Sequence, residues 1–177
     1  IGSNSVTLTV SDKFGNSSSK TATVNVQDSV APIVQTKNIT IQLDASGNAS
    51  ISDDAVNNNS NDACGSISFD TDITDFNCSN IGANTVTLTV TDEHGNSASE
   101  NATVTVEDNV APTAITKNIT VQLDASGNAS ITAAEVDNGS SDNCEIQSLS
   151  LDNTNFDCSN VGTNSVVLTV TDVNNNS

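Results

Sequence analysis

The chain repeats itself with a period of 80 residues. Residues 1–10 (IGSNSVTLTV) recur as residues 81–90 (IGANTVTLTV) and again as residues 161–170 (VGTNSVVLTV). Residues 37–51 (KNITIQLDASGNASI) return at 117–131 with a single change, and no insertion or deletion interrupts the register. Uniform repeats of this kind form linear arrays in which each unit contacts its neighbours. We therefore expect a tandem array rather than one compact domain.

Two Val-Ala-Pro triplets mark the predicted boundaries between repeats. They stand at residues 30–32 and 110–112, and each follows a strand-like segment that ends at Asp28 or Asp108. Proline lacks an N–H and has a fixed φ, so it belongs at a junction or an edge rather than inside a β-ladder. The predicted units are 1–28, the last hairpin of a preceding repeat, 29–108, a complete repeat, and 109–177, a repeat that lacks its last strand. On this interpretation the chain is cut out of a longer polypeptide.

Apolar residues alternate with polar ones through much of each repeat. In residues 85–91 (TVTLTVT) the valines and the leucine would face one side of a strand and the threonines the other. Turn signals rich in Gly and Asx separate such segments at intervals of about 8–12 residues. This pattern predicts an all-β fold of tandem immunoglobulin-like or fibronectin-III-like β-sandwich repeats. One helical turn is predicted at 132–138, with Thr132 and Glu135 forming a capping box.

The charge of the chain is strongly one-sided. Twenty-two acidic residues stand against four lysines and no arginine, which gives a net charge of −18. A surface without a cationic patch cannot release counterions from nucleic acid or from anionic lipid. No apolar run reaches the roughly 20 residues that a membrane-spanning helix needs. We therefore expect no nucleic-acid binding and no membrane insertion.

The four cysteines fall into two pairs with the same spacing, 14 residues within each expected repeat: Cys64 and Cys78, Cys144 and Cys158. The complete repeat contains only two aromatic residues, and small domains with poor cores commonly depend on a cross-link. A zinc site needs four ligands, and a redox Cys-x-x-Cys motif is absent. We therefore predict one disulfide within each repeat, Cys64–Cys78 and Cys144–Cys158, and hence an extracellular location.

The succession of motifs VTLTVTDxxGN, VTVxDxxAP, NITxQLDASGNASI and FxCSNxG resembles the hyalin-type (HYR) repeat. More closely, it looks like the repeats of giant cell-surface proteins of Bacteroidota-type bacteria, and the likeness covers essentially the whole chain. The resemblance implies an immunoglobulin-like fold, secretion (often through the type IX system) and a role in adhesion or in extracellular filaments. That family has no shared catalytic residue, so the resemblance implies that the chain is not an enzyme.

Acidic loop residues form a candidate calcium site at each junction between repeats. In a seven-strand sandwich, the loops at the exit end of one repeat face the loops at the leading end of the next. Four aspartates would converge at the second junction: Asp44, Asp108, Asp142 and Asp172. The equivalent set one junction earlier is Asp28, Asp62 and Asp92. Ca²⁺ bound there would stiffen a rod, as at cadherin junctions, and the alternative is that these are solvated turn residues. His94 is predicted to be a variable surface residue.

These features favour a structural role. We expect a stretch of stalk or filament from a very large extracellular adhesin, cross-linked by disulfides and stiffened by calcium. Its expected partners are further repeats of the same polypeptide, other copies in a homo-oligomer or fibre, and a host, prey or substratum surface reached through other domains. The alternatives are a glycan- or ice-binding module and a spacer in a secreted multidomain enzyme. Sugars commonly stack on Trp or Tyr, and the chain has neither, which disfavours a glycan site.

Overall fold

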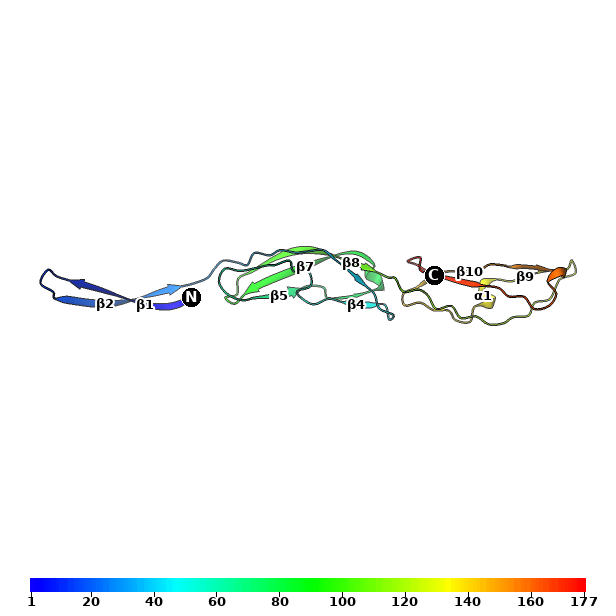
Figure 1. Cartoon of the computed structure of the whole chain (residues 1–177), viewed down its shortest axis with the longest axis horizontal. Coiled ribbons are helices and arrows are strands. Elements are labelled where there is room, and N and C mark those ends of the chain that lie inside the picture. Colours follow the sequence, from blue (N-terminus) through cyan, green and yellow to red (C-terminus); the bar gives the residue numbers. More distant parts are fainter.

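The computed structural model describes residues 1–177 as three bodies in a row along an elongated chain (Figure 1). We call them the N-terminal hairpin (1–28), the middle unit (29–108) and the C-terminal unit (109–177). The fold is all-β, as predicted. Helical structure is confined to α1 (Ala133–Val136) and two 3-10 turns, η1 (Cys78–Asn80) and η2 (Cys158–Asn160). No helix of the chain combines the length and the apolar character that crossing a membrane requires.

The N-terminal hairpin pairs β1 (Gly2–Ser11) with β2 (Ser17–Val26) in antiparallel register, from Gly2↔Val26 to Ser11↔Ser17. In the turn, the Asp12 carboxylate accepts hydrogen bonds from the backbone N–H groups of Phe14 and Asn16, at 2.8 and 2.9 Å. No other part of the chain covers the apolar side chains of this hairpin. Val6, Leu8 and Val10 are 52%, 67% and 62% exposed.

The middle unit contains two sheets. The larger has the strand order β3-β8-β7-β5, built from β3 (Ile39–Gln42), β5 (Ile67–Thr71), β7 (Gly82–Asp92) and β8 (Ser97–Glu107). Strand β8 is antiparallel to β7 and parallel to β3. The smaller sheet pairs β4 (Asn48–Ser50) with β6 (Asp75–Asn77).

The core of the middle unit follows the predicted alternation. Val86, Leu88 and Val90 of β7 are fully buried, and they pack with Val104 and Val106 of β8. Leu43, Val56, Ala102 and Phe76 complete a cluster of nine buried apolar residues. Burying one such side chain contributes about 1.5–3 kcal/mol.

The C-terminal unit repeats this plan in part. It contains β9 (Asn128–Ser130), β10 (Ile146–Leu151), β11 (Asn155–Asp157) and β12 (Leu168–Asp172). The β9–β11 pairing, Asn128↔Asp157, lies 80 residues after the β4–β6 pairing, Asn48↔Asn77. Residues 119–122, which correspond to β3, form no strand. In the middle unit β3 pairs with β8, and the C-terminal unit has no strand equivalent to β8.

The predicted helical turn is confirmed. It forms α1, and Thr132 is its N-cap. The Glu135 carboxylate accepts hydrogen bonds from the backbone N–H of Thr132 at 2.7 Å and from its hydroxyl at 2.9 Å. The reciprocal bonding of an N-cap threonine and a glutamate three residues later is a capping box, which fixes the start of the turn.

Candidate functional site at the junction

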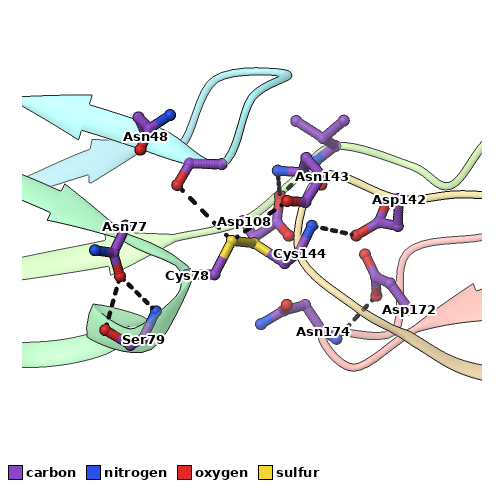
Figure 2. Close-up of a disulfide and its surroundings, with 12 residues drawn as sticks. Asn48, Asn77, Cys78, Ser79, Asp108, Asp142, Asn143, Cys144, Asp172 and Asn174 are labelled. Atoms are coloured by element: carbon purple, nitrogen blue, oxygen red, sulfur yellow. Dashed lines mark hydrogen bonds between the residues drawn. A yellow bond between two sulfur atoms is a disulfide. The ribbon is translucent and has the colours of Figure 1, made fainter.

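A disulfide bond joins the middle unit to the C-terminal unit. Cys78 begins η1 at one end of the middle unit, and Cys144 lies in the loop that precedes β10 (Figure 2). Their Cα atoms are 5.5 Å apart, although 66 residues separate them in the sequence. The bond therefore crosses the junction between two consecutive units.

The predicted pairing of the cysteines is wrong. Neither Cys64–Cys78 nor Cys144–Cys158 forms, and both Cys64 and Cys158 are free and exposed. Cys64 lies near the end of β7 that leads into the 92–96 turn, since Glu93 N–H donates to the Ser66 carbonyl. Cys78 lies just before β7 begins. The 11 residues of β7 span about 33 Å, whereas a disulfide requires Cα atoms within about 7 Å.

Local hydrogen bonds and a glycine place Cys78 at the junction. The Asn77 side chain caps η1, accepting from the backbone N–H and the hydroxyl of Ser79 at 2.9 and 2.7 Å. The turn at Gly47 packs directly on the sulfur, and a Cβ at Gly47 would lie 2.7 Å from Cys78 Sγ and 2.8 Å from the Asn143 carbonyl oxygen. Only a glycine permits this close approach.

Hydrogen bonds from two asparagine side chains reinforce the covalent link. The side-chain amide nitrogen of Asn143 donates to the backbone carbonyl oxygen of Asp44 at 3.2 Å and to the side-chain Oδ1 of Asp108 at 3.1 Å. The Asn176 amide nitrogen donates to the Asp108 carbonyl oxygen at 3.0 Å. Both asparagines belong to the C-terminal unit, so these bonds hold it against the end of the middle unit.

Three of the four aspartates predicted for this junction come together. One carboxylate oxygen from each of Asp108, Asp142 and Asp172 lies within 4.8 Å of the others. Asp108 is only 4% exposed and Asp172 is fully buried. Oxygen ligands of this kind suit Ca²⁺ or Mg²⁺. We call Asp108, Asp142 and Asp172 the junction cluster.

The fourth predicted aspartate, Asp44, does not join the junction cluster. Its carboxylate accepts hydrogen bonds within its own turn, from the backbone N–H groups of Asn48 at 3.0 Å and Ser46 at 2.8 Å. These bonds lower the pKa of the Asp44 carboxyl group below its usual value. Asp44 contacts the junction through its backbone carbonyl oxygen only.

Each member of the junction cluster is fixed by a backbone hydrogen bond. Oδ2 of Asp142 accepts from the Cys144 N–H at 2.9 Å, and Oδ1 of Asp108 accepts from the Val110 N–H at 3.1 Å. Oδ1 of Asp172 accepts from the backbone N–H groups at positions 174 and 176, both at 2.8 Å. Backbone N–H groups therefore hold the three carboxylates in place, and no lysine side chain forms a salt bridge with them.

The equivalent set at the first junction is only partly assembled. The cluster there consists of Asp28, Asp92 and His94, whereas Asp62, predicted as a third ligand, is not part of it. The Asp62 carboxylate accepts from the Cys64 N–H at 2.7 Å, as its counterpart Asp142 does from the Cys144 N–H. Burial would raise the pKa of Asp92, but hydrogen bonds from the side chain and backbone of Asn96 and from the His94 N–H outweigh it, so that the pKa is lowered.

His94 is predicted from the sequence to be a variable surface residue, yet its Nδ1 lies 3.6 Å from Oδ2 of Asp28. The alignment of repeats holds a signal for this placement. His94 occupies the turn position of Asn174, whose side-chain oxygen is buried at the second junction. Comparison with known protein families and with characterised proteins finds no match to the chain.

Proposed function

We propose that the chain is a stretch of tandem immunoglobulin-like repeats from the stalk or filament of a very large extracellular adhesin. The observation that carries this proposal is the disulfide Cys78–Cys144, because it ties one unit to the next rather than closing a unit on itself. A cross-link at a junction limits bending and separation of neighbouring units, which is the property that a stalk needs. Disulfides persist outside the reducing cytoplasm, which supports an extracellular location.

The same proposal divides the chain into 1–28, 29–108 and 109–177. In the middle unit two sheets enclose one apolar core, as in a β-sandwich. The hairpin register Gly2↔Val26 matches Gly82↔Val106, one period later. The exposed Val6 thus corresponds to the fully buried Val86. These facts support residues 1–28 as the last hairpin of another sandwich.

A groove supports the assignment of 109–177 as a sandwich without its last strand. The groove has a volume of about 890 Å³ and runs between residues 116–123 and 160–166. Its apolar lining includes Ile119 and Val121, which are 38% and 41% exposed. In the middle unit β8 fills the corresponding space between β3 and β7. A strand with the sequence pattern of β8 would close the groove.

The test of this function is the location of the protein on the intact cell. Antibodies raised against the 177-residue chain should label the outside of unpermeabilised source cells, in fibrous or stalk-like patterns. Labelling with pre-immune serum is the control for background. Labelling only after lysis, or a longer native polypeptide that carries a catalytic domain and few repeats, would contradict the proposal.

A further inference from the structure

We propose that the junction cluster binds a divalent cation, and that Ca²⁺ is the ion it suits. The proposal deepens the proposed stalk function. Only the consequence of cation binding, the stiffening of the array, rests on that function. The site is formed by residues from both sides of the junction. Asp108 belongs to the end of the middle unit, whereas Asp142 lies in a loop of the C-terminal unit and Asp172 ends its strand β12 (Figure 2).

The first support is uncompensated charge. Three carboxylates lie within 4.8 Å of one another, and two of them are almost completely buried. No lysine forms a salt bridge anywhere in the chain. The only two ion pairs involve His94 at the other junction. Buried like charges are strongly unfavourable unless a counter-ion neutralises them. A divalent cation would do so.

The second support is a set of buried oxygens that lack any hydrogen-bond donor. They are Oδ2 of Asp108, Oδ1 of Asp142, and the side-chain oxygens of Asn143 and Asn174. Asp108 as a residue is only 4% exposed. Buried acceptors without donors are rare and costly in folded proteins. All four atoms belong to residues in or beside the junction cluster, as Figure 2 shows, and a bound cation would satisfy such acceptors.

The ligand chemistry selects the ion. The candidate donors are carboxylate and amide oxygens only, with no imidazole nitrogen in the junction cluster. Ca²⁺ accepts 6–8 oxygen ligands of mixed type in irregular geometry, whereas Mg²⁺ requires near-octahedral geometry and retains water. The first junction differs, because His94 stands where the second has Asn174. The second junction is therefore the better calcium site.

Calorimetric titration of the whole oxidised 177-residue chain tests the site. After removal of metals with EDTA, CaCl2 should bind and raise the melting temperature. Asp108→Asn and Asp142→Asn should each weaken binding at one site by about tenfold or more, equivalent to about 1.4 kcal/mol or more. Asp124→Asn is the matched control, because it removes the same charge from an exposed turn outside the cluster. This control should bind Ca²⁺ as the parent chain does.

Three outcomes would overturn the proposal. They are no binding at millimolar CaCl2, equal effects of Asp108→Asn and Asp124→Asn, and tighter binding of MgCl2 than of CaCl2. None of these measurements depends on where the protein is located in the cell. A failed titration would therefore leave the stalk function standing, and failed surface labelling would leave the cation site standing.

A second inference concerns the two free cysteines. We infer that Cys64 and Cys158 each form a disulfide with a flanking repeat, so that every junction of the array is cross-linked as Cys78–Cys144 is. Cys158 stands at the position of Cys78 and Cys64 at that of Cys144, one period away in each case. Both free thiols are exposed and accessible to such a partner.

The surroundings of each free cysteine reproduce those of its bonded counterpart. Cys158 begins η2, which Asp157 caps through Ser159 as Asn77 caps η1 through Ser79. A Cβ at Gly127 would lie 2.7 Å from Cys158 Sγ, the same distance as between a Cβ at Gly47 and Cys78 Sγ. The capped turn and the glycine that surround Cys78 are thus repeated around Cys158, at the far end of the C-terminal unit.

The loop around Cys64 is also prepared as in the bonded case. The Cys64 N–H donates to Oδ2 of Asp62 at 2.7 Å, and the Cys144 N–H donates to Oδ2 of Asp142 at 2.9 Å.

In forming each of the proposed disulfides, two thiols lose two protons and two electrons. The acceptor is the disulfide of a thiol–disulfide oxidoreductase, which becomes a dithiol.

Extending the chain in register tests this inference. Residues 98–177 are appended after Ser177, since Ser177 aligns with Ser97, and the product is oxidised and mapped without reduction. We expect the original Cys158 to be linked to the appended copy of Cys144. In the Cys158→Ser control, that appended cysteine should be a free thiol. A free Cys158 in the oxidised extended chain, or a Cys64–Cys158 bond in it, would overturn the inference.

Discussion

Gly47 occupies the most crowded position at the junction. Its φ is +74°, and an added Cβ would meet both Cys78 Sγ and the Asn143 carbonyl oxygen at under 3 Å. We expect Gly47→Ala to destabilise the oxidised chain by about 1–3 kcal/mol, because strained backbone is combined with a clash. Gly127→Ala is the control: φ is +80°, but the neighbouring Cys158 is free and can rotate away. Chemical denaturation measures both. Equal losses would show that the junction contact contributes nothing.

The aspartates in the turns make the stability of the folded chain depend on pH in the acidic range. Hydrogen bonds from the Asn48 and Ser46 amides lower the pKa of Asp44 in the folded chain. The stabilisation is therefore fully present above the unfolded pKa, near 3.9, and is lost as the pH falls through the lower folded pKa. We expect the melting temperature to be steady from pH 7 to about 5 and to fall below about 4. The fall should be shallower in Asp44→Asn, and a fall of the same steepness in this variant would contradict the assignment.

At the level of strands and turns, sequence patterns predicted the features that depend on interactions between residues close in the sequence. The alternation in residues 85–91 and the Thr132–Glu135 capping box were confirmed, because both depend on residues a few positions apart. The cysteine pairing was wrong because the spacing of 14 residues says nothing about which end of a sandwich each cysteine occupies. Cys144 follows Asp142, which the sequence analysis placed at the leading end of its repeat. The same reasoning would have placed Cys144 at that end, next to the preceding repeat. The His94–Asp28 contact depends on the packing of a linker against a turn, and only the alignment of His94 with Asn174 of the next repeat points to it.

The groove of the C-terminal unit leads to a prediction about one strand. Appending residues 98–107 after Ser177 supplies a copy of β8, whose Val104 and Val106 are buried in the middle unit. We expect this strand to fill the groove and raise the melting temperature, since each buried valine contributes about 1.5–3 kcal/mol. Hydrogen exchange at 119–122 should slow as that segment gains a partner. An extension with both valines changed to Ser should do neither. Equal stabilisation by the two extensions would contradict the prediction.

At the scale of the whole molecule, the three bodies lie in a row and the contacts that set their order are polar or covalent (Figure 1). With a net charge of −18, neighbouring units repel one another unless cations or cross-links oppose the repulsion. The disulfide at the junction resists separation at any ionic strength. It also alters how the chain would respond to tension. A pulling force applied to the two ends passes through the disulfide, so the segment between Cys78 and Cys144 is not stretched.

Stretching single molecules by their ends measures that loop. The disulfide spans 66 residues, so in the oxidised chain the segment between Cys78 and Cys144 cannot extend. At roughly 3.5 Å per residue, full extension should be about 230 Å shorter in the oxidised chain than after reduction. Cys78→Ser should give the longer extension under both conditions, whereas Cys64→Ser should retain the dependence on reduction because Cys64 is free. Equal extension of the parent chain before and after reduction would show that the bond does not carry load between units.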